Sequence, residues 1–522
     1  MTGVRVWAPA ARHVELDSGG RRQAMSPAED GWWAGPGLPP GQDYAFRLDG
    51  GGPLPDPRSP SQPSGVHGPS RTVEHGSFPW TDAGWRGREL PEAVVYELHV
   101  GAFTPEGTFE AVIQKLDHLV EVGVDALELM PVAEFSGDRG WGYDGADLWA
   151  PHHVYGGPEG LKRLVDACHA RGLAVILDVV YNHLGPEGNY LGRFGPYFTG
   201  RHHTPWGKAI NFDGPRSRPV RDFFIENGLM WLRDYHLDGL RLDAVHAIVD
   251  DSRPHIVEEL ASRVHDLGRR LERRLWVIAE EPSINPTLLG YGIDAQWNDT
   301  FHHALHVLLT GERSGYYAPY GTVADLAAAL REPRSLGLPY TRFLAYSQDH
   351  DQVGNRAGGD RLSQLVDGGR LRLAAALPLL SPFVPMVFMG EEWGASTPFL
   401  FFSDHRDPAV GRATTRGRVH EFQAFGWRAE DVPDPQARSS FERSKLDWSE
   451  PAREPHGALL GWYRELIRLR RTMGGVPLEV EEAEGRLLMT RGPVRVSCDF
   501  AKGRVQVEAA SVPGSARRIH TG

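Results

Sequence analysis

An arginine and a carboxylate lie two residues apart in the stretch DGLRLDAVH (residues 238–246). Its apolar residues predict a buried strand, on which alternate side chains share a face, so Arg241 and Asp243 would point the same way. A cation beside Asp243 would keep this carboxylate ionised at neutral pH, as a nucleophile requires. A structural ion pair is the alternative, and such a pair is weak evidence on its own.

Other strand-like runs also begin apolar and end polar. Their polar residues are Asp178, Asn182 and His183 in one run, Glu280 and Glu281 in another, Asp299 in a third, and Asp349, His350 and Asp351 in a fourth. A single acidic end would be unremarkable, because Asp and Asn also begin turns and cap helices. Several in succession, with histidines among them, indicate one shared pocket.

Glycoside hydrolysis is the chemistry that suits these residues. It requires two carboxyl groups beside the scissile bond, one ionised to attack and one protonated to serve as acid. Asp243 with its arginine suits the nucleophile. Glu280 follows the apolar run WVIA, and an apolar setting raises a carboxyl pKa, which suits a general acid.

A metal centre is the rival interpretation. The possible ligands are His99, Asp178, His183, His246, His302, His303 and His350. Barrel metallohydrolases usually show an H-x-H pair at the end of the first strand, whereas ELHVG offers a single histidine. No G-x-G-x-x-G or P-loop motif follows a strand. We therefore expect neither a metal nor an organic cofactor.

Eight strand candidates alternate with amphipathic helices. The candidates span 94–101, 126–132, 173–183, 238–246, 275–281, 294–299, 342–351 and 384–392. This alternation predicts an α/β fold, a (β/α)8 TIM barrel, whose active site lies at the carboxyl ends of its strands. An open, doubly wound sheet is the alternative.

Short β runs flank the barrel on both sides. We predict three domains: an N-terminal β-sandwich with its linker over residues 1–88, the barrel over 89–473, and a small C-terminal β domain over 474–522. The sandwich is expected to be immunoglobulin-like, of the kind found in carbohydrate-binding modules. Cys168 is expected in the core. One helix is predicted from the apolar stripe formed by Phe109, Val112, Ile113, Leu116, Leu119 and Val120.

Composition excludes several classes of function. The 522 residues carry a net charge of −12, which argues against a nucleic-acid partner. No apolar run is long enough to span a membrane, and residues 1–16 do not resemble a signal peptide. The two cysteines suit a reducing compartment. We therefore expect a cytoplasmic protein.

The segments DVVYNH, GLRLDAVH, VIAE and QDHD occur in this order on the predicted strands. In them the sequence resembles the α-amylase superfamily of retaining glycoside hydrolases. The resemblance implies Asp243 as nucleophile, Glu280 as acid/base and Asp351 as the carboxylate that stabilises the transition state. It also implies that Arg241, His183 and His350 contact the sugar in the −1 subsite.

Longer segments, such as GDRGWGYDGADLWAPHHVYGGPEG and LLSPFVPMVFMGEEWGASTPFLFFSDH, resemble the malto-oligosyltrehalose trehalohydrolase family within this superfamily. Its members cut the α-1,4 bond next to a terminal trehalose and act together with a malto-oligosyltrehalose synthase. The expected substrate is malto-oligosyltrehalose. The implied substrate contacts are Tyr143, Asp178, His183, Arg241, His246, Asp299, Phe301, His302, His303, His350, Gln352 and Asn355.

The sequence departs from the family pattern at three points. Asp349 replaces an Asn, Glu281-Pro282 replaces Ser-Asp, and Thr300 replaces an Asp. None of these removes a predicted catalytic residue, and Thr300 stands where the family has an Asp that is expected to contact substrate. The charges of Asp349 and Glu281 are expected to raise the pKa of the acid.

Two other functions remain open. A glycogen branching enzyme shares the sandwich and all four segments but transfers chains instead of releasing trehalose. A non-catalytic α-glucan-binding protein would normally have lost a catalytic carboxylate. The aromatic and acidic run GEEWGASTPFLFF (residues 390–402) is a candidate for recognising trehalose, with barrel packing as its alternative.

Overall fold

A closed barrel of eight parallel strands forms the centre of the computed structural model, which describes residues 2–424, 426–483, 485–510 and 516–521. The barrel strands are β8 (Val95–Leu98), β9 (Ala126–Leu129), β12 (Ala174–Val179), β15 (Gly239–Leu242), β16 (Trp276–Ala279), β17 (Ala295–Trp297), β18 (Phe343–Ala345) and β19 (Val384–Phe388). Each lies within one predicted run, in the predicted order. Because β8 pairs with both β9 and β19, the sheet closes, and the open-sheet alternative is excluded.

The strand that carries Arg241 is shorter than predicted. β15 ends at Leu242, and Ala244 takes a left-handed conformation with φ 38° and ψ 57°. The prediction that Ala244 and Val245 continue the strand was therefore wrong. After this turn the side chains no longer alternate between the two faces of the sheet, and His246 is exposed.

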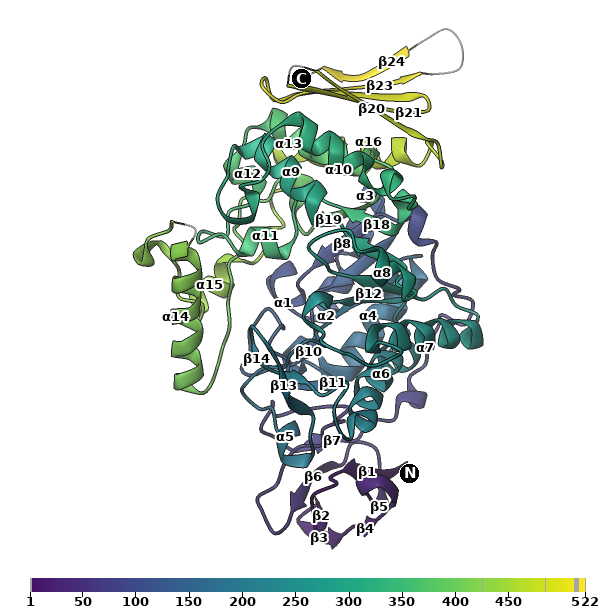
Figure 1. Ribbon diagram of the computed structural model, residues 1–522, viewed down its shortest axis with the longest axis vertical. Helices are drawn as coiled ribbons and strands as arrows, with labels where there is room; N and C mark the ends of the chain where they lie inside the picture. Colours follow the sequence, from purple (N-terminus) through teal and green to yellow (C-terminus); the bar gives the residue numbers. More distant parts are fainter. Residues whose placement is uncertain (1, 425, 484, 511–515, 522) are drawn as a thin grey trace.

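Helices surround the barrel, and further helices lie beyond it (Figure 1). They are α1 (Val100–Phe103), α2 (Phe109–Ile113), α3 (Leu116–Val122), α4 (Gly157–Ala170), α5 (Leu191–Phe194), α6 (Ser217–Asp234), α7 (Ile256–Leu271), α8 (Pro286–Gly290), α9 (Asp299–Thr310), α10 (Val323–Ser335), α11 (His350–Gly354), α12 (Leu362–Leu365), α13 (Gly368–Leu380), α14 (Pro408–Ala424), α15 (Arg438–Arg443) and α16 (His456–Arg470). The predicted helix from Phe109 to Val120 is two helices, α2 and α3, and Cys168 is buried as expected. None of the helices in the described part of the chain has the length and apolarity needed to cross a bilayer.

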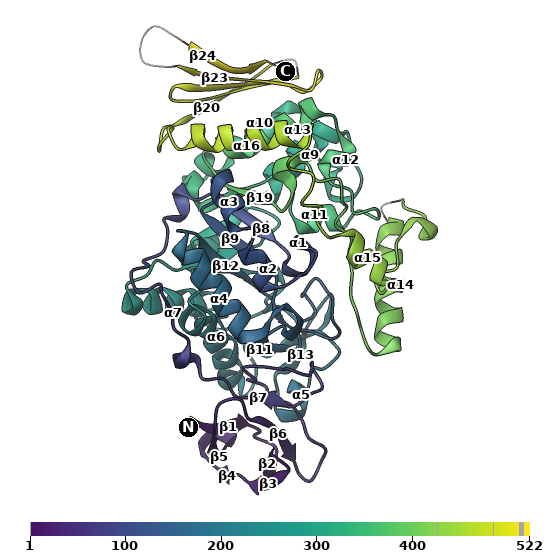
Figure 2. The same ribbon diagram turned by 180° about the vertical axis from the view of Figure 1, so that it is seen from behind.

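Two antiparallel sheets precede the barrel at one end of the molecule's long axis, as Figures 1 and 2 show. Their strands are β1 (Thr2–Trp7), β5 (Trp32–Leu38) and β4 (Ser26–Pro27) in one sheet, and β3 (Arg21–Ala24), β2 (Val14–Ser18), β6 (Asp43–Leu48) and β7 (Ser70–Arg71) in the other. Val6, Leu16, Trp33 and Phe46 from both sheets are buried in one hydrophobic core. This arrangement agrees with the predicted sandwich.

A five-stranded antiparallel sheet follows α16 at the opposite end of the molecule (Figures 1 and 2). Its strands are β20 (Leu478–Ala483), β21 (Arg486–Arg491), β22 (Val494–Asp499), β23 (Arg504–Ala510) and β24 (Ala516–Thr521). Because β7 ends at Arg71 and β20 begins at Leu478, we propose 1–88, 89–473 and 474–522 as the domain limits.

Two hairpins extend from the barrel loops. β10 (Ala133–Glu134) pairs with β11 (Asp147–Pro151) and encloses the loop 135–146, which carries Tyr143. β13 (Phe198–Thr204) pairs with β14 (Gly207–Ile210), and Trp206 lies in their turn. Both hairpins carry aromatic residues to the region of the barrel strand ends described next.

Candidate active site

Asp243 lies directly after β15 and is held by two donors. Arg241 Nη1 donates to its Oδ1 at 2.8 Å, and Asn182 Nδ2 donates to its Oδ2 at 2.8 Å. Burial raises the pKa of this carboxyl, but the charges of Arg241 and His183 and the bond from Asn182 together outweigh burial. The pKa of Asp243 therefore lies below its usual value, and the group is an ionised carboxylate held in place at neutral pH, as a nucleophile requires.

The guanidinium of Arg241 contacts three carboxyl groups. It contacts Asp178 at 2.7 Å, Asp243 at 2.8 Å and Glu280 at 3.0 Å. The cation lies over the ring of Trp297, 4.3 Å from its centroid, and its side chain is almost fully buried. A planar guanidinium is well suited to orient several carboxylates at once, so Arg241 is more than a structural partner of Asp243.

Glu280 follows β16, and its Oε2 is held by one hydrogen bond and one ion pair. The backbone N–H of Ala244 donates at 2.7 Å, and Arg241 Nη2 lies at 3.0 Å. Burial is the largest cause that raises the pKa of Glu280 to about 8, against the lowering effect of Arg241. A carboxyl of this kind is protonated at neutral pH and can donate its proton, as a general acid must.

Negative charges near Glu280 add to the effect of burial. The carboxylates with the largest effect on its pKa are Asp243, Asp351 and Asp299. The sequence-based expectation named Asp349 and Glu281 instead. Asp349 caps a helix, as described next, and Glu281 is only partly buried, so neither is among the largest contributors.

Asp351 lies in the first turn of α11, whose N-cap is Asp349. Asp349 Oδ1 accepts the backbone N–H groups of Asp351 and Gln352, both at 2.9 Å. Asp and Asn cap helices equally well, so the replacement of Asn by Asp at this position preserves the cap. Asn355, one turn on, donates to Asp351 Oδ1 at 2.6 Å.

His350 connects α11 to the first barrel strand. Its Nδ1 contacts Glu97 on β8 at 2.5 Å, and its Nε2 lies 2.8 Å from the hydroxyl of Tyr143. Burial lowers the pKa of His350, but Glu97 and the nearby carboxylates outweigh it and raise the pKa to about 10. The imidazole is therefore a cation that donates from both nitrogens.

Tyr143 closes this side of the site. Its hydroxyl donates to Asp178 Oδ2 at 2.6 Å, and its ring stacks on His350 with centroids 5.1 Å apart. On the other side, the ring of His183 stacks on Trp206 at 4.4 Å. Tyr143 and His183 are partly exposed, and Trp206 is half exposed, so sugar faces can reach all three rings.

Several predicted substrate contacts lie elsewhere. Phe301 is fully buried against Phe383, and His302 is buried between Tyr346 and His306. Both pack behind β17 and β18, because the first turn of α9 directs them inward, and their contact with substrate remains a prediction. His246 is exposed after the left-handed turn at Ala244 and has no hydrogen-bond partner among the described residues.

The other predicted contacts surround the carboxylates. Asp299 accepts from Tyr346 and raises the pKa of Glu280, and His303 contacts the backbone oxygen of Asp299. Gln352 and Asn355 lie on or next to α11. Their contacts with substrate remain predictions.

The run 390–402, which follows β19, belongs largely to the core. Trp393, Phe399 and Phe402 are fully buried, and Glu391 accepts from Ser347 at 2.6 Å and from Tyr463 at 2.7 Å. Packing, the alternative interpretation, is therefore correct for most of this run. Phe401 is the aromatic residue of the run that stays partly exposed.

Four residues of the site were given no role from the sequence. Glu97 orients His350, Asn182 holds Asp243, and Trp297 lies under Arg241. Arg418, on α14, donates to Asn355 Oδ1 at 2.9 Å and lies 4.4 Å from the centroid of Phe401. Asn182 and Glu97 stand at polar strand ends, a visible pattern, whereas Arg418 is 67 residues beyond Asp351 with no motif around it.

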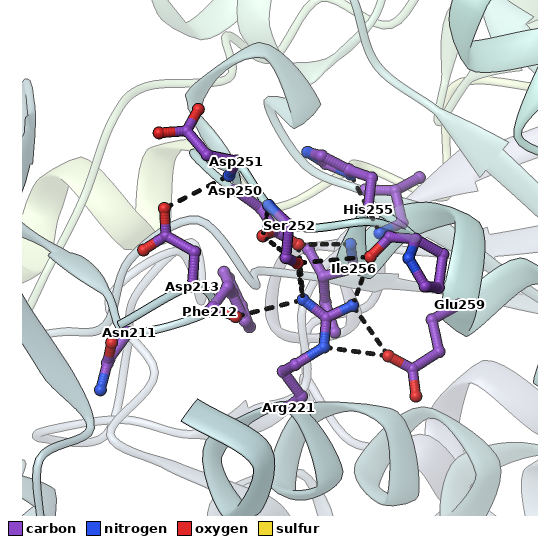
Figure 3. A network of polar contacts seen from close by, with 12 residues as sticks. Asn211, Phe212, Asp213, Arg221, Asp250, Asp251, Ser252, His255, Ile256 and Glu259 are labelled. Atoms are coloured by element: carbon purple, nitrogen blue, oxygen red, sulfur yellow. Dashed lines mark hydrogen bonds and ion pairs between the residues drawn. The ribbon is translucent and has the colours of Figure 1, made fainter. Parts of the chain in front are cut away.

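The loop after β15 is held by Arg221 of α6 (Figure 3). Its guanidinium donates to Asp250 Oδ2 at 2.6 Å, to Ser252 Oγ at 2.7 Å and to the carbonyls of Phe212 and Pro254. It also donates twice to Glu259, at 2.9 and 2.8 Å. The loop that follows Asp243 is thus anchored to α6 and α7.

Replacing Arg221 by methionine is expected to destabilise the protein by about 3 kcal/mol or more, because it leaves the buried carboxylate of Asp250 without its cation. Chemical denaturation measures the change. Arg218→Met is the control: Arg218 also contacts Glu259, but it is half exposed, and such pairs contribute at most about 1 kcal/mol. Equal losses for the two variants would contradict the anchoring role.

Comparisons with known proteins agree with this geometry. The family model for the alpha-amylase catalytic domain matches residues 76–228. A malto-oligosyltrehalose trehalohydrolase from Arthrobacter ramosus is 51% identical over 96% of this chain and 93% of its own, and one from Rhizobium sp. (strain M-11) is 46% identical over 99% and 93%. A crystal structure described as a putative alpha amylase from Salmonella typhimurium has a TM-score of 0.87 at 38% identity, over 98% of this chain and 93% of that one.

Proposed function

The chain belongs to the malto-oligosyltrehalose trehalohydrolases, and we propose that Asp243, Glu280 and Asp351 perform the reaction of that family by a retaining mechanism. The enzyme hydrolyses the α-1,4 bond next to the terminal trehalose of a malto-oligosyltrehalose and releases trehalose. One observation carries the proposal for the site: a single buried guanidinium contacts both an ionised Asp243 and a Glu280 whose pKa is about 8.

In the first step Asp243 attacks the anomeric carbon of the sugar on the glucan side of the bond. Glu280 gives its proton to the bridging oxygen, so trehalose leaves with a free hydroxyl at that position, and a glycosyl–Asp243 ester forms. Oε2 of Glu280 accepts the backbone N–H of Ala244 and lies 3.0 Å from the Arg241 cation, so Oε1 is the oxygen that carries the proton. Asp351, held by Asn355, binds hydroxyls of the distorted sugar.

In the second step Glu280, now ionised, takes a proton from water, and the hydroxide attacks the ester carbon. The bond to Asp243 breaks, and the glucan leaves with its original α configuration. Arg241 contacts one oxygen of each carboxyl group, at 2.8 Å for Asp243 and 3.0 Å for Glu280. This favours direct attack, since an inverting enzyme needs a gap of about 6.5–9.5 Å for a water molecule.

The basic limb of the pH profile is expected near pH 8. Glu280 must be protonated to act as acid, so kcat/KM falls as pH rises through its pKa of about 8. Asp243 has a lowered pKa and stays ionised through the neutral range. The measurement is kcat/KM from pH 4 to 10.

The variant Asp299→Asn tests whether the basic limb of the pH profile reports the pKa of Glu280. Removing the charge of Asp299, which raises the pKa of Glu280, is expected to move the limb to lower pH whatever its effect on kcat. A wild-type limb near the ordinary glutamate pKa, about 4.3, would exclude Glu280 as the acid.

Hydrolysis is favoured over chain transfer, because both relatives described above are named trehalohydrolases and the match covers 93% of each of them. The proposal extends to the physiological setting: a cytoplasmic enzyme that consumes the product of a malto-oligosyltrehalose synthase in trehalose biosynthesis. Release of trehalose from maltopentaosyl-trehalose tests the function. New α-1,6 branches in amylose would support the branching-enzyme alternative.

A further inference from the structure

The hairpin that encloses the Tyr143 loop buries two acids opposite each other. Glu134 of β10 and Asp147 of β11 are cross-strand partners, and their exposed fractions are 0% and 5%. Like charges directly opposite each other destabilise a strand pair. A buried acidic pair of this kind therefore needs cations or protons around it.

Two consecutive histidines follow β11 and face Glu134. His153 Nδ1 lies 2.7 Å from Glu134 Oε1, and His152 Nδ1 lies 3.3 Å from Glu134 Oε2. The ring of His152 is fully buried and stacks on Phe135, with centroids 3.9 Å apart and an angle of 18° between the planes. Its packing therefore holds this imidazole in place beside the carboxylate.

Some polar atoms of this group lack hydrogen bonds. Both ring nitrogens of His152 and Oδ2 of Asp147 are buried and have no hydrogen-bond partner among the described residues. The 3.3 Å approach of His152 to Glu134 does not have hydrogen-bond geometry, in contrast to the bond that His153 makes. Unsatisfied buried polar atoms are rare in folded proteins, and a bound ion or water is a common reason for them.

Two imidazoles and one carboxylate are a common zinc ligand set. Ligand atoms about 2.0–2.1 Å from a tetrahedral zinc are about 3.3 Å from each other, which is the separation of His152 Nδ1 and Glu134 Oε2. His153 Nδ1 would move outward by about half an ångström as the metal replaces its hydrogen bond to Glu134. The side chain of His153 is 29% exposed, which provides a route for the ion.

We propose that Glu134, His152 and His153 bind a divalent transition-metal ion of the zinc class, with Asp147 adding negative charge beside it. The site joins β10 to the residues that follow β11, the two strands that enclose the loop 135–146 with Tyr143. Its role is structural: the reaction uses Asp243 and Glu280, and neither belongs to this group. The proposal does not depend on which glycoside the enzyme cleaves.

Metal binding is tested on full-length protein without a histidine tag, stripped with EDTA and dialysed. Titration with Zn²⁺ in a calorimeter is expected to show one strong site, and Co²⁺ is expected to give the intense visible absorption of a tetrahedral complex. His153→Ala and Glu134→Gln are each expected to weaken Zn²⁺ binding at least tenfold. Unchanged affinity in both variants, or no site tighter than about 0.1 mM in the wild type, would overturn the proposal.

His202→Ala is the matched control. His202, Asp213 and Asp251 form a second histidine–carboxylate group, but Asp251 is mostly exposed. This variant is expected to keep the wild-type affinity. If it alone abolished binding, the ion would belong to that surface group, and the proposal would be wrong.

Thermal melting separates a structural ion from a catalytic one. Added Zn²⁺ is expected to raise the Tm of the stripped wild type but not that of His153→Ala, because a ligand that binds only the folded state stabilises it. The kcat of stripped and Zn²⁺-loaded enzyme is expected to agree within twofold well below Tm. A Zn²⁺-dependent kcat with unchanged Tm would contradict the structural role.

Discussion

Asp243→Ala and Glu280→Gln are each expected to lower kcat on malto-oligosyltrehalose by about a thousandfold or more, while both variants fold. Asp243→Ala removes the nucleophile, and Glu280→Gln removes the proton donor; general acid catalysis alone contributes about 10²–10⁴-fold. Circular dichroism and thermal melting check the fold. Glu281→Gln is the control, because it removes the neighbouring carboxylate, which is only partly buried, and is expected to leave kcat within threefold.

An activated substrate distinguishes the two roles. Fluoride leaves an α-glycosyl fluoride with little need for protonation, so Glu280→Gln is expected to regain much of its glycosylation rate on that substrate. Asp243→Ala is not expected to regain this rate, because it still lacks the nucleophile. If either variant kept more than a tenth of wild-type kcat on the natural substrate, a loss of under about 1.4 kcal/mol, the assignment would fail.

Maltopentaosyl-trehalose is expected to have a kcat/KM at least about 100-fold above that of maltoheptaose, which contains the same number of glucose units. Trehalose has no reducing end and offers only hydroxyls and apolar sugar faces. A leaving-group site built for two α,α-1,1-linked glucoses leaves polar groups unpaired when a differently linked disaccharide occupies it, and such mismatches discriminate strongly.

Initial rates with both substrates at several concentrations give this ratio. Equal values would indicate an ordinary amylase. Trp206→Ala is informative here, because its half-exposed ring stacks on His183 at the rim of the site. A larger loss of kcat/KM on maltopentaosyl-trehalose than on maltoheptaose would show that this ring contacts the trehalose leaving group.

The barrel could be predicted because each of its strands has a recognisable sequence pattern, an apolar run with a polar end. Runs such as WVIAEE are apolar where the strand is buried and polar where it ends, and the closed barrel brings those ends together. The environment of Glu280 followed from the same pattern: a carboxyl at the end of an apolar strand is buried, and its pKa is raised.

Loops and helix faces could not be predicted in this way. Phe301 and His302 follow Asp299 in the chain, but the first turn of α9 directs them into the core. The run 390–402 contains acids and aromatic residues as a sugar site would, yet Glu391 and Trp393 are buried by long-range partners on α16 and in the loop before it. Arg418 reaches Asn355 only through the tertiary position of α14. Each outcome depends on contacts between residues distant in sequence.

Proton NMR of the first products formed from maltopentaosyl-trehalose tests the central claim most directly. The anomeric signals identify both the released sugar and the configuration of the new reducing end before mutarotation. We predict free trehalose together with maltopentaose whose new reducing end is first the α anomer. A first product in the β configuration would exclude Asp243 as a nucleophile in a retaining reaction, and release of glucose or maltose without trehalose would contradict the proposed function.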